Sequence, residues 1–304
     1  MQVITVNSCP CCGGRDLDWP FHRDARVVEA FRLLSQIKYG GYMDGWEQHL
    51  SLVMAQCRRC GHIWHHTRPD QNALFDMYAH GKRRKGHTVP TRPSARMLST
   101  MRGLFRYCAQ TDRETTFLDY GSGAGRWSVA AREAGFRVTA YEPSTIRQVN
   151  ADGIEVISTL QEIKGRCFDV INLEQVLEHV PDPASDLRRL KQICHSDTVL
   201  RISVPDIARY GKKLWTGFPF DGKTMHALSP YEHLHGFRQT SLRALLQAVG
   251  LLPCTGWRLA LCFPRYVLER FTIGMGAPFG RTLVLARFRK LEITPGIETG
   301  GFSR

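Results

Sequence analysis

The sequence predicts an α/β protein whose core is a mostly parallel sheet with helices on both faces. From about residue 94 onwards, short apolar runs alternate with stretches whose apolar residues recur at helical spacing. The runs lie at 116–120, 137–141, 154–157, 170–173 and 199–204, and the helical stretches lie near 126–134, 144–151, 182–194 and 240–249. Strands separated by helices form doubly wound parallel sheets that are buried on both faces.

The end of the chain departs from this alternation. Gly256–Phe263 and Thr282–Arg289 read as two late strands without a long helix of their own, and with the five earlier runs they make a seven-stranded sheet. We therefore expect this α/β domain at 94–304. A basic linker at 81–93 and a small cysteine-bearing module at 1–80 precede it, and the module has a helical insertion at 24–55 that Gly40-Gly41 interrupts.

The composition indicates a folded protein without a transmembrane segment and with an anionic partner. Hydrophobic residues make up 43% of the 304 residues, which is typical of a folded chain. No run of about 18 apolar residues and no signal-peptide pattern is present, so we expect a cytoplasmic protein without a transmembrane segment. The net charge of +13 favours an anionic partner. The densest basic stretch, Lys82–Lys85, is either a solvated linker or an anion-binding segment.

A glycine-rich turn follows the first strand of the α/β domain. Gly121, Gly123 and Gly125 let the backbone turn sharply before a helix whose first N–H groups are free to bind a ligand. A dinucleotide fingerprint would need glycine where Arg126 stands. The next strand ends in Glu142, 17 residues beyond Gly125, and an acid at that place can accept hydrogen bonds from both hydroxyls of a ribose.

These motifs closely resemble those of class I S-adenosylmethionine-dependent methyltransferases. The resemblance rests on Gly-x-Gly-x-Gly with Asp119 two residues ahead, and on a strand-four segment, 168–183, that contains Val-Leu-Glu-His-Val-x-Asp-Pro. It implies a Rossmann-like fold and S-adenosylmethionine as cofactor. The cofactor-binding residues that it implies are Asp119, Gly121, Ser122, Gly123, Gly125 and Glu142, with Glu174 and Gln175 as further candidates and an adenine contact near Ser158–Leu160.

Two segments are candidates for the acceptor side. His179 follows the fourth strand, and its ordinary pKa suits a general base, although Glu178 and His179 would equally cap and orient the next helix. A later polar segment contains Tyr231, Glu232, His233 and His235. The chain resembles deoxysugar C-methyltransferases in organisation, and these use Tyr and His groups for deprotonation, which makes Tyr231 and His233 catalytic candidates. The alternative is a polar loop with structural hydrogen bonds.

Two cysteine pairs predict a structural zinc site in a zinc-ribbon-like module. Cys9 and Cys12, like Cys57 and Cys60, are separated by two residues and followed by glycine, so each turn can present two thiolates to one tetrahedral ion. Cys11 and His62 are possible substitutes for one ligand, and the other cysteines are expected to pack in the core. A similar zinc-binding start, a tyrosine (here Tyr78) and a methyltransferase core occur together in proteins tied to sugar, cell-surface polysaccharide or natural-product modification.

The leading functional hypothesis is methyl transfer to an oxygen or carbon of a small anionic acceptor, with a sugar, a nucleotide sugar or a related natural-product or cell-surface precursor favoured. An RNA methyltransferase that holds phosphates with its zinc module and basic linker is the alternative. The segment Leu173–Val176 disfavours it, because no Asn-Pro-Pro-Tyr-type signature stands there. A non-catalytic cofactor-binding scaffold is the third hypothesis.

Overall fold

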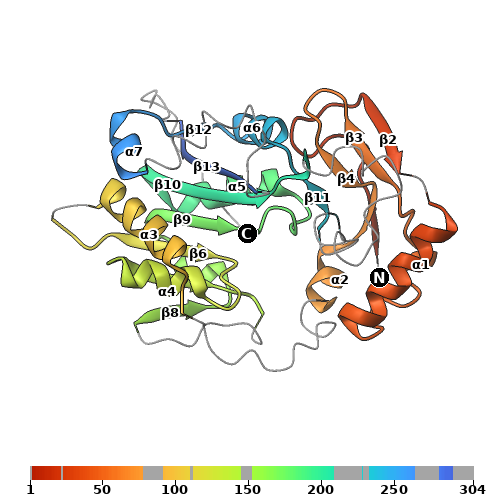
Figure 1. Ribbon diagram of the computed structural model, residues 1–304, viewed down its shortest axis with the longest axis horizontal. Coiled ribbons are helices and arrows are strands. Elements are labelled where there is room, and N and C mark those ends of the chain that lie inside the picture. The colour runs from red at the N-terminus through yellow and green to blue at the C-terminus, as the bar shows by residue number, and fades with distance from the viewer. Residues whose placement is uncertain are drawn as a thin grey trace, which may run out of the picture.

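The computed structural model describes residues 2–21, 23–77, 92–109, 112–144, 153–208, 228, 233–263 and 281–289. Within them a seven-stranded sheet has the order β12-β13-β10-β9-β6-β7-β8 (Figure 1). Its strands are β6 (Thr116–Tyr120), β7 (Arg137–Tyr141), β8 (Ile154–Ile157), β9 (Phe168–Glu174), β10 (Cys194–Pro205), β12 (Leu251–Pro253) and β13 (Arg281–Phe288).

The sheet is mostly parallel and has one topological switch point. The strands from β8 to β10 are parallel, while β13 runs antiparallel to both β10 and β12. From β6 the chain proceeds outward through β7 and β8, then returns to place β9 on the other side of β6. Open α/β sheets bind ligands outside the carboxyl ends of the strands at such a point. The predicted Rossmann-like, doubly wound sheet is confirmed.

Helices cover both faces of this sheet. The helices α3 (Ala95–Cys108), α4 (Arg126–Glu133) and α7 (Trp257–Cys262) supply buried residues to one core cluster, together with alternate strand residues such as Phe117 and Val170. The helices α5 (Pro183–Leu190) and α6 (Gln239–Ala248) pack on the other face, where Leu118 and Ile171 point. Short 3-10 segments lie at Leu160–Ile163 and Lys191–Ile193. Successive side chains of a strand point to opposite faces, which explains the two clusters.

The N-terminal part forms two small sheets beside a helix. The strands β1 (Val3–Thr5) and β5 (Thr67–Pro69) pair with each other. A second sheet has the order β11-β4-β3-β2, with β2 (Leu17–Phe21), β3 (Met54–Cys57), β4 (Ile63–His65) and β11 (His235–Gly236). Around them lie α1 (Ala25–Tyr39), a 3-10 turn at Trp46–Gln48 and α2 (Gln71–Asp76). The edge strand β11 therefore comes from far beyond residue 80, after the fifth strand of the large sheet.

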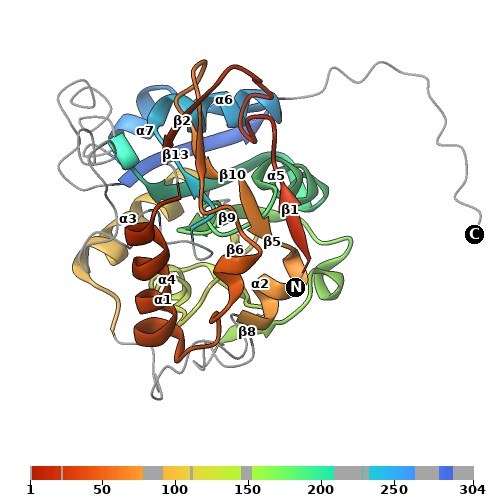
Figure 2. The same cartoon turned by 90° about the vertical axis from the view of Figure 1, so that its right-hand side faces the viewer.

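The two parts of the chain share one core. Cys57 and Trp64 of the second sheet belong to the same buried cluster as Phe237, Leu242 and Leu200. In Figure 1 the N-terminal elements lie to the right of the large sheet, and Figure 2 shows them in front of it. Among the described helices, none has the length and apolar content that a membrane span requires.

Two sequence predictions about elements are wrong. Residues 257–262, predicted as a strand, form α7, which has the good helix formers Arg258, Leu259 and Ala260 and buries Leu259 against the α3 side of the core. The helical insertion ends early: Gly40, with φ 61°, caps α1, and Met54 begins a strand instead of continuing a helix. The predicted helix at 144–151 lies almost entirely outside the described residues.

Candidate functional site

The glycine-rich turn between β6 and α4 is tied to the end of β7. Gly121, Gly123 and Gly125 have φ values of 72°, 55° and 75°, a region that glycine enters without steric cost. The backbone N–H groups of Gly121 and Ser122 donate to the Tyr141 carbonyl at 2.9 and 3.0 Å. A Cβ on Gly121 would lie 3.0 Å from Val176 Cγ2, so the turn also packs closely against the loop after β9.

Glu142 lies at the carboxyl end of β7, beside this turn. Its Oε2 accepts a hydrogen bond from Gly123 N at 2.8 Å, and its Oε1 accepts one from Ser144 N at 3.0 Å. Only 7% of the residue is exposed. The carboxylate is thus oriented by two backbone donors at the place where the sequence motifs predict that a ribose binds.

A row of polar side chains crosses the sheet at the switch point. Asp119 on β6 is in register with Asn172 on β9, which is in register with Arg201 on β10. Asp119 accepts hydrogen bonds from Ser128 Oγ at 2.5 Å and from Asn172 Nδ2 at 2.7 Å, and burial raises its pKa.

Arg201 completes the row and links it to Glu174. Its Nη1 donates to Asn172 Oδ1 at 2.6 Å and to Glu174 Oε2 at 2.7 Å, while its guanidinium lies 4.1 Å from the centre of the Trp127 ring. Asn172, Arg201 and Trp127 were not predicted from the sequence. A polar residue in the middle of an otherwise apolar strand, such as Arg201 between Leu200 and Ile202, was the available signal.

Several polar atoms beside the turn are buried and have no partner among the described residues. In the described part of the chain, no hydrogen-bond partner is found for Ser122 Oγ, Ser144 Oγ or Gln175 Nε2. Gln175 also has φ 56°, which is uncommon for a residue other than glycine and is characteristic of functional sites. Buried polar groups are almost always hydrogen-bonded, so these atoms fit a bound polar ligand. S-adenosylmethionine, with its ribose and amino-acid groups, has the matching donors and acceptors.

Three of the acceptor-side candidates lie close together after β9. A carboxylate oxygen of Glu178 and ring nitrogens of His179 and His233 all lie within 4.8 Å of one another. The two imidazole rings meet edge to face with their centres 4.6 Å apart. Glu178 and His233 are buried, whereas the His179 side chain is 25% exposed. Tyr231 and Glu232 lie outside the described residues.

The four predicted zinc ligands converge from two turns. Cys9 Sγ lies 3.5 Å from Cys60 Sγ, Cys12 Sγ lies 3.5 Å from Cys57 Sγ, and all four sulfurs are within 4.8 Å of one another. Ligands about 2.3 Å from a tetrahedral zinc ion are about 3.8 Å apart. The donor set therefore fits a structural zinc ion.

The two turns have the same backbone pattern. The N–H of Gly13 donates to the Cys9 carbonyl and that of Gly61 to the Cys57 carbonyl, both at 2.8 Å. Hydrogen bonds from one thiol to another raise the pKa of Cys9, through Cys11, and of Cys60, through Cys9. A bound cation would reverse this effect, because metal ligands must be thiolates.

The two other residues that were candidate zinc ligands have other contacts. Cys11 is buried beside Cys9 and stays outside the group of four. His62 also stays outside the group of four and contacts His235.

The sequence matches a known protein family. Residues 94–252, just over half of the chain, match the model of a family described as "Methyltransferase domain". No curated protein matches the sequence.

Similar solved structures are themselves methyltransferases. One is the 1,6-didemethyltoxoflavin-N1-methyltransferase of Burkholderia thailandensis with S-adenosylhomocysteine bound (19% identity, 63% of this chain, 78% of that chain, TM-score 0.40). Another is the magnesium protoporphyrin IX methyltransferase of Synechocystis PCC 6803 (13%, 64%, 83%, TM-score 0.42). A third is the plantazolicin methyltransferase BpumL (12%, 88%, 100%, TM-score 0.47). With its family match, glycine turn and seven-stranded sheet, the chain belongs to the class I S-adenosylmethionine-dependent methyltransferases.

Proposed function

We propose that the enzyme methylates an oxygen or carbon of a small anionic acceptor, a sugar or nucleotide-linked sugar, and that its four-cysteine site holds a structural zinc ion. The observation that carries the acceptor side of the proposal is the cluster of Glu178, His179 and His233 just beyond the carboxyl end of β9. Two imidazoles and a carboxylate supply both a base and hydrogen-bonding groups for an acceptor that must lose a proton.

His179 is the proposed general base. Its side chain is the most exposed of the three, and it follows Gln175, the strained residue at the edge of the cofactor site, by four positions. An imidazole nitrogen can take up the proton that a hydroxyl or an acidic carbon loses. His233, edge-on to the His179 ring, orients it. Tyr231 remains a candidate on sequence grounds.

The cofactor side follows from the residues around the glycine turn. When bound, S-adenosylmethionine supplies a methyl group that is already activated by its sulfonium. Glu142 would hold the ribose hydroxyls, and the backbone of Gly121–Gly125 would pack against the amino-acid part. Asp119, fixed by Ser128 and Asn172, would orient the ammonium. The enzyme then has to align donor and acceptor and remove a proton.

A screen with methyl-labelled S-adenosylmethionine tests this function. Purified zinc-loaded enzyme is incubated with nucleotide sugars, sugar phosphates and, separately, bulk RNA at low salt. We expect label in a sugar-containing product and none in RNA. Label in RNA alone would replace the proposal with the RNA methyltransferase. If calorimetry finds no binding of S-adenosylmethionine, both enzyme hypotheses are refuted.

A further inference from the structure

His235 lies where the small zinc-module sheet meets the loop after β9. Its backbone pairs with Trp64 across β11 and β4, and its ring is buried, with 1% of the residue exposed. It follows His233 by two residues. The same short segment therefore carries one acceptor-side histidine and the edge strand of the zinc module.

This segment binds the chain on both sides of His179. The N–H groups of Leu234 and His235 donate to the Glu178 carbonyl at 2.7 and 3.3 Å. The ring Nε2 of His235 lies 3.0 Å from the Val180 carbonyl oxygen. The two carbonyls that flank His179 are thus both bound by residues next to His233.

The other side of the ring contacts the zinc module. Its Nδ1 lies 3.1 Å from His62 Nε2, and the His62 ring stacks on that of Trp64. We assign the His235 proton to Nε2, because the Val180 carbonyl can only accept and lies nearer than Arg68 Nη1, which is 3.2 Å from the same nitrogen. In this tautomer Nδ1 accepts from His62, and Arg68, which can only donate, is a neighbouring positive charge without a hydrogen bond to the His235 ring. Burial, aided by the Arg68 charge, lowers the pKa of His235 well below its ordinary value, so the ring stays neutral.

The turn that carries Cys57 and Cys60 makes a second connection to the residues that follow His235. Thr240 Oγ1, at the start of α6, donates to the Cys60 carbonyl at 2.8 Å. His62, the partner of the His235 ring, follows Cys60 by two residues. This turn therefore fixes His62, which contacts the His235 ring on the side opposite the loop after β9.

We propose that His235 is a positioning residue for methyl transfer, which holds His179 at a fixed place relative to His233 and anchors both to the zinc-bearing sheet. The inference rests on the proposed function, in which His179 is the base. Misplacement of a reacting group by about 1 Å costs about 100-fold in rate. A purely structural contact between the two parts would lower stability and leave the turnover of the folded enzyme unchanged.

Three substitutions separate the two ring contacts. His235→Phe keeps an aromatic ring, although a somewhat larger one, and removes the contacts of both ring nitrogens. His235→Gln keeps a donor near the position of Nε2, and His235→Asn keeps an acceptor near that of Nδ1. The matched control is His66→Phe, because His66 lies just beyond β4, bonds to Asn7 at 2.9 Å and does not touch the loop.

The variants are compared as zinc-loaded proteins for kcat, KM and affinity for S-adenosylhomocysteine. We expect kcat of His235→Phe to fall about 100-fold with cofactor affinity within about twofold, partial recovery in His235→Gln, and no change in His66→Phe. An unchanged kcat in folded His235→Phe overturns the proposal. If that variant does not fold, the kcat of His235→Asn is the test, because this variant loses the Val180 contact. A wild-type kcat in His235→Asn overturns the proposal equally.

A second measurement does not depend on the acceptor. In ¹⁵N-histidine spectra of the enzyme with S-adenosylhomocysteine, we expect the His179 and His233 ring signals to shift in His235→Phe and to stay in place in His66→Phe. If the wild type methylates no acceptor, the proposed function fails while this comparison still tests the geometry. Unshifted His179 and His233 signals would refute the positioning role itself.

Discussion

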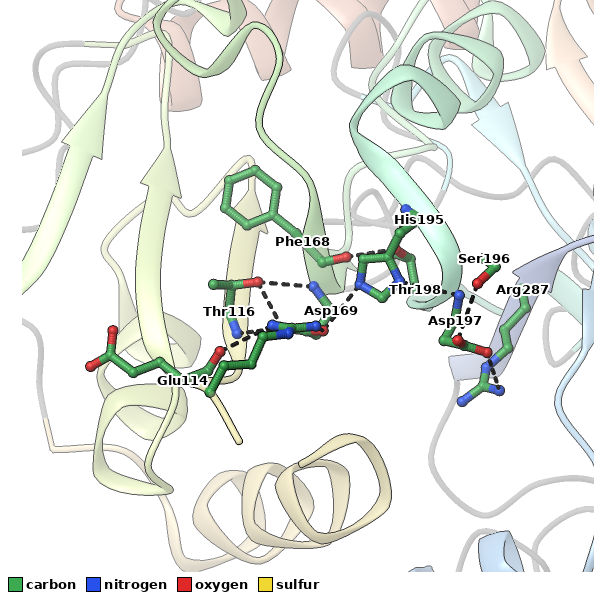
Figure 3. Close-up of polar contacts among 10 residues, drawn as sticks. Glu114, Thr116, Phe168, Asp169, His195, Ser196, Asp197, Thr198 and Arg287 are labelled. Atoms are coloured by element: carbon green, nitrogen blue, oxygen red, sulfur yellow. Dashed lines mark hydrogen bonds and ion pairs between the residues drawn. The ribbon is translucent and has the colours of Figure 1, made fainter. Parts of the chain in front are cut away.

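Asp169 offers the most quantitative test of the fold. It stands at the start of β9, and the functional site lies at the other end of this strand. Its carboxylate accepts two hydrogen bonds from Arg113 at 2.8 and 2.5 Å, one from the Thr116 N–H at 2.7 Å and one from Thr116 Oγ1 at 2.9 Å, and His195 Nε2 lies 3.0 Å away (Figure 3). Burial alone would raise its pKa, but these donors hold the pKa at about 2, below the ordinary 3.8.

The pKa shift of Asp169 determines how much its carboxylate contributes to folding stability. A difference of nearly two pKa units between the unfolded and folded states corresponds to about 2.5 kcal/mol of folding stability. Because the folded pKa is lowered, this contribution is complete above the unfolded pKa of 3.8 and is lost as the pH falls through about 2. We expect Asp169→Asn to lower the free energy of unfolding by about 2.5 kcal/mol at pH 7, and by about half of that at pH 3.

Urea denaturation of both proteins at the two pH values measures this difference. Other groups, the four cysteines at 9, 12, 57 and 60 included, titrate in both proteins, so their contributions cancel in the difference. The control is Glu155→Gln, because Glu155 is also bound by an arginine, Arg166, but its side chain is 47% exposed. A surface ion pair contributes less than about 1 kcal/mol. An equal loss in the two variants, or a loss for Asp169→Asn that does not change between pH 7 and pH 3, would refute the reasoning.

Three further predictions concern the site. Glu142→Ala should abolish binding of S-adenosylmethionine in calorimetry, whereas His233→Ala should retain binding and lose turnover; equal loss of binding would contradict this division of roles. Gly121→Ala should weaken cofactor binding about tenfold or more by combining positive-φ strain with the Val176 contact, and Gly165→Ala, with φ 80° and open space around its Cβ, should leave binding unchanged. Chelation of zinc should lower the melting temperature by several degrees, and cobalt substitution should give thiolate charge-transfer absorption; absence of such bands would exclude the four-cysteine zinc site.

The cofactor half of the site could be predicted because its signals are local. The turn at Gly121–Gly125 needs glycine for backbone reasons, and Glu142 follows at the end of the next strand. The row from Asp119 to Arg201 could not be predicted, because its members are brought together by the register of three strands. Register depends on the packing of whole faces, which no short motif encodes.

The acceptor half was predictable only as a set of polar segments. His179 and His233 could be singled out by residue type, but their meeting depends on the hydrogen bonds to the Glu178 carbonyl. The mistaken strand at 256–263 has a similar cause. A short apolar run suits a strand or a buried helix equally, and its packing against α3 decides between them.

The pairing of β11 with β4 also limits how this enzyme can be divided or recombined. A fragment that ends near residue 80 would leave the outer edge of β4 without its partner, with Trp64 no longer covered by the segment at 235–237. Such unpaired edges favour aggregation. A chimera that exchanges the N-terminal module between two such enzymes would need to carry over the matching residues at 233–240, because these residues pair with β4 and bond to the Cys60 carbonyl.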